Sequence, residues 1–158
     1  MFLVNLVPLL LLVGVLTQSG VDADEHLEEQ ANNLREAIKA VVETVCKYSM
    51  EHNTDGVMTM IDPDARALVD GYPAFVGFDE IRTIVEVFPE KASHIDVNFK
   101  EVKPMDKDAN LVWSLFHVEF FNEAGEKYND ATQVTIFRKN PDGYKYYIAD
   151  VNKHNQPA

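Results

Sequence analysis

The apolar and polar positions that follow residue 23 have the pattern of a long amphipathic helix. From residue 24 to about residue 51, apolar residues recur in alternating steps of four and three, with charged residues between them. The apolar positions are Leu27, Ala31, Leu34, Ile38, Val41, Val45 and Tyr48. A coiled coil would use the same stripe, but the pattern stops after about three heptads. We therefore expect one helix that packs against a core.

Two shorter helices are expected after this one. Residues 53–56 read Asn-Thr-Asp-Gly, which is typical of a turn, and residues 57–61 fit one or two further helical turns. A third helix is expected to begin near Asp79, because apolar residues follow at helical spacing. Phe88-Pro89 ends it, since the residue before a proline is disfavoured in a helix.

The rest of the chain alternates with the period of two that is typical of strands. Short strands are expected at 65–70 and 74–77, and longer ones at 94–102, 110–121, 127–139 and 144–152. The loops between the long strands are rich in Gly, Pro, Asn and Asp, so these strands should form an antiparallel meander. The order of elements predicts an α+β fold, with three N-terminal helices packed on a strongly curved, mainly antiparallel sheet.

The strand at 110–121 indicates which side of the sheet is buried. One side is almost entirely apolar and is assigned to the helix-covered, concave face; it carries Val112, Ser114, Phe116, Val118 and Phe120. The other side begins with Leu111, Trp113 and Leu115, which a monomer would expose. We therefore expect a homodimer that covers these residues.

The N-terminus has the pattern of a secretory signal peptide. Residues 2–16 are an almost unbroken apolar run, and Val21 and Ala23 suit the −3 and −1 positions of a cleavage site, although the usual Lys or Arg near the start is missing. We expect a signal peptide at 1–23, a single domain at 24–152 and a flexible tail at 153–158. An uncleaved anchor is the alternative, but the run is shorter than the ~20 residues that span a bilayer. The mature protein is expected to be secreted, without stable membrane insertion.

The composition narrows the choice of partners. The chain has 26 Asp and Glu against 14 Lys and Arg, a formal net charge of −12, which disfavours nucleic acid and anionic membranes. Cys46 is the only cysteine, so no intrachain disulfide can form. Its apolar helical surroundings predict a buried, inert thiol, and an intermolecular disulfide is the alternative.

Three short motifs occur along the chain in a particular order. They are Asp64-Ala65 in the first strand, Gly77-x-x-x-Ile81 at the third helix, and Phe137-Arg138-x-Asn140-x-x-Gly143 in the last hairpin. Over about residues 30–152 the sequence resembles the nuclear transport factor 2-like superfamily, in particular its SnoaL-like and ketosteroid isomerase-like branches. The resemblance implies a cone-shaped fold with a helix-lined pocket. That superfamily includes isomerases, dehydratases, cyclases, transport adaptors and assembly domains, so the fold does not decide the function.

The isomerase pattern is only partly present. The resemblance places its general base on Asp70, with a one-residue gap, and its carboxylic acid donor on Thr135. Its tyrosine donor falls on Val45, one helical turn before Tyr48. Threonine is a weaker donor than a neutral carboxylic acid, which disfavours an unmodified isomerase mechanism. The candidate catalytic residues are therefore Asp70 and Tyr48. The expected ligand-binding residues are Val45, Tyr48, Asp70, Val112, Phe116, Val118, Phe120 and Thr135.

The favoured hypothesis is a binding protein for a small hydrophobic molecule, with no cofactor and no metal. The alternatives are an isomerase or lyase that uses Asp70 as its base, and an assembly domain without catalysis. Tyr144, Tyr146 and Tyr147 are interpreted as core packing or as pocket lining. Two pairs on neighbouring strands would suit a metal ion, but polar positions opposite an apolar face are usually solvated; these pairs are His94 with Asp96, and His117 with Glu119.

Cleavage after Ala23 predicts a secreted chain that begins at Asp24. The intact mass of protein collected from secreting cells should therefore lack residues 1–23. An Ala23→Arg variant is the control, because signal peptidase requires a small residue at the −1 position. Full-length wild-type chain in the membrane fraction would support the uncleaved anchor instead.

Overall fold

A computed structural model of the chain describes residues 7–87 and 92–154, with side chains from residue 25 onward. It divides into two compact units, residues 1–34 and residues 35–158. Helix α1 (Val7–Met50) begins in the first unit and ends in the second. Among the described residues, no helix is both long and apolar enough to cross a membrane. The start of the expected signal peptide and most of the expected tail lie outside the described residues, and cleavage after Ala23 stays a prediction.

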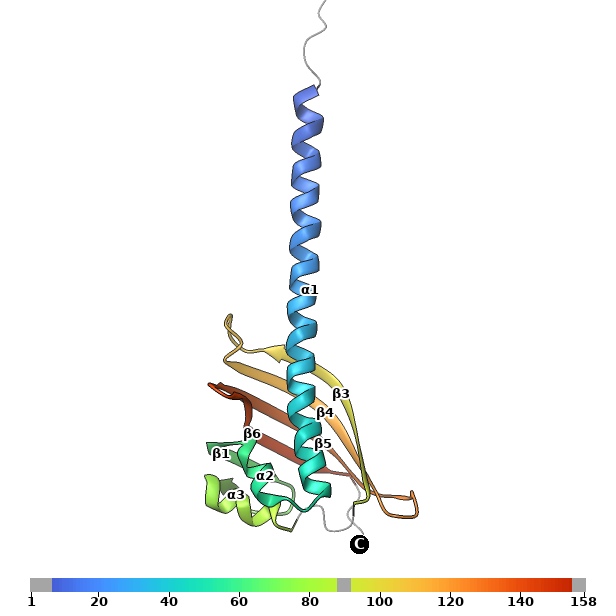
Figure 1. Cartoon of the computed structure of the whole chain (residues 1–158), viewed down its shortest axis with the longest axis vertical. Helices are drawn as coiled ribbons and strands as arrows, with labels where there is room; N and C mark the ends of the chain where they lie inside the picture. The colour runs from blue at the N-terminus through green and yellow to red at the C-terminus, as the bar shows by residue number, and fades with distance from the viewer. Residues whose placement is uncertain (1–6, 88–91, 155–158) are drawn as a thin grey trace, which may run out of the picture. The chain divides into compact units, whose positions relative to one another are not determined.

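A curved sheet of six strands forms the centre of the second unit (Figure 1). Its strand order is β2-β1-β6-β5-β4-β3. The elements after α1 are α2 (Thr54–Thr59), β1 (Ile61–Val69), β2 (Phe75–Val76), α3 (Phe78–Val85), β3 (His94–Pro104), β4 (Leu111–Phe121), β5 (Lys127–Asn140) and β6 (Gly143–Lys153). These elements confirm the α+β class.

The sheet is mixed rather than purely antiparallel. Strands β3 to β6 form the expected antiparallel meander, and β2 is antiparallel to β1. Strand β1, however, runs parallel to β6, so the first strand in chain order lies beside the last one. The expectation of three N-terminal helices needs correction, because α3 follows β1 and β2. A glycine makes this order possible: Gly77, the residue before α3, has a φ of 84°, which only glycine adopts without strain.

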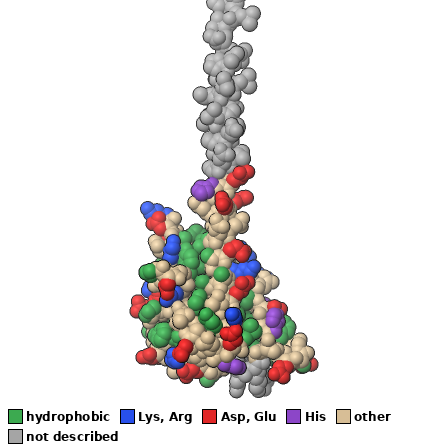
Figure 2. Space-filling model, viewed as in Figure 1, with side chains coloured by type: hydrophobic (Ala, Val, Ile, Leu, Met, Phe, Trp, Pro, Cys, Tyr) green, Lys and Arg blue, Asp and Glu red, His purple; other side chains and the backbone are tan. Residues whose placement is uncertain are grey.

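The buried core lies on the concave side of the meander. The burial of β4 alternates, and Val112, Ser114 and Phe116 are at most 1% exposed, as the sequence pattern predicts. From α1, Ile38 and Val42 are the most buried side chains. Acidic side chains are spread over the face of this unit that is visible in Figure 2. The charged groups therefore lie mainly outside a core that is almost entirely apolar.

Two described carboxylates are buried, and the more buried of them, Asp62 at the start of β1, is only 1% exposed. Arg138 Nη1 donates to its Oδ1 at 3.1 Å, and Asn140 Nδ2 donates to its Oδ2 at 3.2 Å. The backbone N–H of Asp64 donates to Oδ1 at 3.0 Å. Arg138 and Asn140 are two positions apart on β5, so both side chains lie on one side of the strand and reach the same carboxylate.

Removing the arginine should therefore destabilise the fold. An Arg138→Met variant leaves the buried Asp62 carboxylate without its cation, and we expect the free energy of unfolding to fall by about 2 kcal/mol. An Arg66→Met variant is the matched control, because Arg66 is an exposed arginine on β1, and its effect should stay within about 0.5 kcal/mol. Urea unfolding followed by circular dichroism measures both. Equal stability of the two variants would mean that the ion pair contributes nothing.

Candidate functional site

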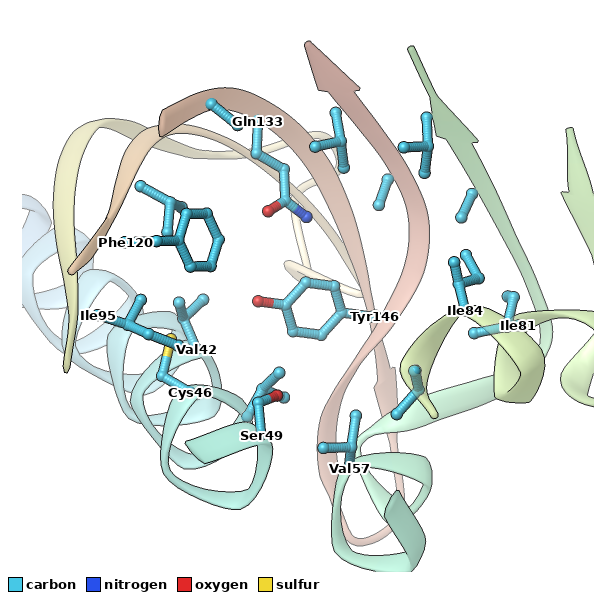
Figure 3. Close-up of a pocket in the computed structure, with 18 of the residues that line it drawn as sticks. Val42, Cys46, Ser49, Val57, Ile81, Ile84, Ile95, Phe120, Gln133 and Tyr146 are labelled. Carbon is cyan, nitrogen blue, oxygen red and sulfur yellow. The ribbon is translucent and has the colours of Figure 1, made fainter. Parts of the chain in front are cut away.

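A cavity of about 260 Å³ lies between α1, α3 and the concave side of the sheet (Figure 3). Its walls come from every long element of the second unit: α1, β1, α3 and the four strands of the meander. Most of the lining side chains are apolar and include Val42, Val57, Ile81, Ile84, Phe116 and Val118. Such a concave space, lined by helices and strands and open on one side, is the usual form of a small-molecule site.

Helix α1 presents a different face to the cavity from the one that the hydrophobic stripe predicts. Val42, Val45, Cys46 and Ser49 line the cavity, whereas Tyr48 does not. The stripe has a period of about 3.5 residues, while a straight helix has 3.6 residues per turn, so the stripe drifts around the helix along its length. By the last turns of α1, this drift has moved Cys46 and Ser49 onto the inner face.

Three of the predicted ligand-binding residues on β4 and one on α1 do line the cavity. Phe116, Val118 and Phe120 alternate along β4 and all point to the concave side, as predicted. Val45 joins them from α1. The structure therefore brings together the apolar half of the predicted set.

The polar half of the predicted set lies elsewhere. Asp70 is exposed in the turn after β1, where its backbone N–H donates to Val151 O at 3.1 Å. Tyr48 packs beside α2, since a Cβ placed on Gly56 would be 2.8 Å from Tyr48 Cγ. Thr135 is 0% exposed in the core and does not line the cavity. Asp70, Tyr48 and Thr135 thus do not meet in the cavity wall.

Val112 and Thr135 belong to the layer of the core beyond the cavity. Val112 is 0% exposed and pairs with Phe137 of β5. The Oγ1 atom of Thr135 has no hydrogen-bond partner within the described part of the chain. Its carbonyl accepts a hydrogen bond from Ser114 at 3.5 Å. Both residues therefore contribute to packing behind the ligand space.

Polar side chains that line the cavity include Tyr146, Gln133 and Ser49 (Figure 3), and also Tyr72, Asn129 and Lys153. Tyr146 is 9% exposed, and its ring packs edge-on against Phe137 with 4.7 Å between the ring centroids. Burial, together with the nearby Cys46, raises the pKa of Tyr146 well above its usual value. Its hydroxyl is therefore protonated at any physiological pH and is available as a hydrogen-bond donor.

Cys46 contributes a neutral thiol to the same wall. Burial, reinforced by the negative charge of Glu43, raises the pKa of Cys46 to about 12. Because the thiolate is the nucleophilic form, this cysteine is a poor nucleophile at neutral pH. Its thiol acts as a small apolar group that completes the cavity wall.

Among the three tyrosines near the C-terminus, the structure assigns a different environment to each. Tyr146 lines the cavity, Tyr144 donates its hydroxyl to Ala109 O at 2.8 Å, and Tyr147 lies 3.5 Å under the guanidinium of Arg138. A register shift between Ile136 and Phe137 changes the alternation on this hairpin. Strict alternation along the sequence therefore does not identify Tyr146. The tyrosine cluster is the one sequence signal that included it.

A charged cluster occupies the opposite face of the sheet. His117 Nε2 lies 3.5 Å from Asp130 Oδ2 and 3.9 Å from Glu119 Oε1, and the three ligand atoms of these residues are within 4.8 Å of one another. Lys127 Nζ donates to Glu119 Oε1 at 2.9 Å and to Asp130 Oδ2 at 3.4 Å. These hydrogen bonds, first with Glu119 and then with Asp130, raise the pKa of Lys127. Lys127 thus supplies a cation to the two carboxylates.

This cluster differs from the metal pairs considered in the sequence. His94 and Asp96 form their own hydrogen bond on β3, at 2.8 Å, with exposed side chains. Asp130, which is only 8% exposed, and Lys127 were not anticipated. Both come from β5, and only the pairing of β4 with β5 brings them beside His117.

Solved structures match this fold at low sequence identity. A ketosteroid isomerase-like protein from Erwinia carotovora atroseptica has a TM-score of 0.63 at 18% identity, over 77% of this chain and 96% of that chain. An NTF2-like protein of unknown function from Shewanella oneidensis has 0.62 at 11% identity, over 74% and 97% of the two chains. A domain of unknown function with a cystatin-like fold, from Nostoc punctiforme, has 0.65 at 13% identity, over 78% and 79%. No protein-family model matches the sequence, and no curated protein matches it.

Proposed function

We propose that this chain, whose fold is that of the nuclear transport factor 2-like proteins, binds a small hydrophobic molecule in the cone-shaped pocket of that fold. The observation that carries the proposal is the cavity of about 260 Å³ with its largely apolar walls. Protein interiors are normally close-packed, so the side chains that line a space of this size lack van der Waals contacts on one side. A bound ligand would supply these contacts. An apolar ligand would gain those contacts and leave water.

The position of Asp70 favours binding over catalysis. A general base must lie within hydrogen-bond reach of the substrate proton that it removes. Asp70 is exposed and does not line the cavity, and Thr135 and Tyr48 do not line it either. The isomerase or lyase hypothesis would require all of these groups to approach one ligand, so it has less support than the carrier.

The affinity for a plain hydrocarbon probe should follow the apolar wall. For tetralin, a bicyclic hydrocarbon, we expect Phe116→Ala to weaken binding about tenfold, because it removes aromatic contact from the cavity. Asp70→Asn should leave the dissociation constant unchanged within about twofold, since Asp70 lies outside the cavity wall. Isothermal titration calorimetry on the wild type and both variants measures this.

Phe116→Ala could lose binding because it misfolds, so a cavity-filling variant provides an independent test. Ala149 lines the cavity from β6, and Ala149→Phe should occupy the space and abolish tetralin binding while the circular dichroism spectrum is retained. If the wild type binds neither tetralin nor an oxygenated derivative of it, or if Asp70→Asn weakens tetralin binding as much as Phe116→Ala does, the carrier proposal fails. The assembly-domain hypothesis would then be preferred.

We further propose that the protein is secreted and acts as a homodimer through the outer face of the sheet. Secretion is supported by the leader pattern of residues 1–23. The dimer is supported by a row of half-buried apolar residues that the strand register aligns across β4, β5 and β6: Trp113, Ile136 and Ile148. Leu115 and Val134 form the neighbouring pair on the same face.

A charge placed in this row should prevent dimerisation. We expect wild-type protein to sediment as a dimer at tens of micromolar (about the range of an assay) and Trp113→Glu to sediment as a monomer, because the glutamate would be buried without a partner. A Lys107→Glu variant is the control, since Lys107 is an exposed residue of the loop between β3 and β4, outside this row. A monomeric wild type would contradict the dimer.

A further inference from the structure

Two uncharged polar side chains project into the largely apolar cavity from neighbouring strands. Figure 3 shows the hydroxyl of Tyr146 and the amide of Gln133 directed into the same space, from β6 and β5. Within residues 7–87 and 92–154, neither group makes a hydrogen bond to the protein. Tyr146 as a whole is 9% exposed, and Gln133 is half-buried. Polar groups that face a mainly apolar cavity and have no partner in the protein are free to hydrogen-bond a ligand, so these two point to a partner in the ligand space.

The chemical state of the two groups limits what this partner can be. The raised pKa of Tyr146 keeps its hydroxyl protonated, and the Gln133 amide is neutral at every pH. Neither group offers the positive charge that a buried carboxylate would need. Lys153 also lines the cavity, seven residues after Tyr146 on β6 and closer to Gln133, whose strand partner is Val151. Its Nζ lies 4.9 Å from the centroid of the Tyr72 ring. The polar end of the ligand that meets the Tyr146 hydroxyl is therefore uncharged, and a carboxylate probe tests whether Lys153 binds an anion in the same cavity instead.

The remaining walls define the rest of the ligand. Val42, Ile95 and Phe120 surround the space in front of the Tyr146 hydroxyl in Figure 3. They offer contact area and no hydrogen bonds. A ligand that fits must therefore be apolar apart from the group that meets Tyr146.

We infer that Tyr146 and Gln133 are specificity-determining residues for a neutral, largely apolar ligand that carries one hydroxyl or carbonyl oxygen. Tyr146 donates a hydrogen bond to this oxygen, and the Gln133 amide forms the second one. The inference rests on the proposed function, because it specifies the ligand of the same cavity. These two residues are not the positions that the family resemblance implies for oxygen recognition, which fall on Val45 and Thr135.

The inference is tested with four probes that share one ring system. Tetralin has no oxygen, 1-tetralol carries a hydroxyl, 1-tetralone carries a carbonyl, and tetralin-1-carboxylate carries an anion. We expect the wild type to bind the better of the alcohol and the ketone about tenfold more tightly than tetralin, and to bind the carboxylate more weakly than either. The comparison of alcohol with ketone shows whether Gln133 acts as acceptor or donor.

Tyr146→Phe should abolish the preference for oxygen. The variant keeps the ring that packs on Phe137 and loses only the hydroxyl, so the affinity for tetralin should change less than twofold. Because that hydroxyl has no hydrogen-bond partner in the described part of the chain, the melting temperature should not fall. Tyr144→Phe is the matched control, since the Tyr144 hydroxyl donates to Ala109 O and the residue is not part of the cavity wall. It should retain the full preference.

Gln133→Leu gives a second, independent variant that removes the amide at similar volume. It should reduce the preference for oxygen without weakening tetralin binding. If the wild type binds tetralin but does not prefer the oxygenated probes, or if Tyr146→Phe retains the preference, the inference is overturned and the proposed carrier function stands. If the wild type binds none of the four probes, the carrier function itself fails.

Discussion

The buried carboxylate of Asp62 is the interaction on which the geometry of the second unit depends. A charge that is 1% exposed is tolerated only when hydrogen bonds and a counter-ion replace its water, and Arg138 and Asn140 supply both. This contact joins the start of β1 to the end of β5. The backbone N–H of Tyr146 also donates to Met60 O at 2.9 Å, next to the start of β1. Strand β1 is thereby held parallel to β6, and the first and last strands of the chain lie side by side.

The position of Tyr146 in the cavity follows from the same contact. Phe137 precedes Arg138, is 0% exposed and packs against the Tyr146 ring at 4.7 Å. The motif Phe137-Arg138-x-Asn140 therefore makes two contacts. Arg138 and Asn140 hydrogen-bond to Asp62, and the ring of Phe137 packs against Tyr146. A polar group held by rigid strands in this way is placed more accurately than one on a loop. This supports a role for Tyr146 in recognising a ligand.

The two faces of β4 divide the proposed functions between them. Phe116, Val118 and Phe120 line the cavity, while Trp113 and Leu115 belong to the outer row that we propose as a dimer surface. The solved structures with this fold share only 11–18% identity with the chain in the three comparisons given above. At that level of identity the likeness concerns the fold, and the function has to be argued from the residues of the cavity itself.

The sequence by itself determined the helices, the strands, the antiparallel meander and the apolar half of the site, Val45, Phe116, Val118 and Phe120. These features depend on local periodicity and turn residues, which a single strand or helix expresses without its neighbours. Only the tertiary structure decided that β1 runs parallel to β6, that Asp70 and Tyr48 lie outside the cavity wall, and that Tyr146 and Gln133 face the cavity. The register shift between Ile136 and Phe137 changes which side chains face inward. Such a shift depends on pairing between distant segments, and a shift by one residue moves side chains to the other face.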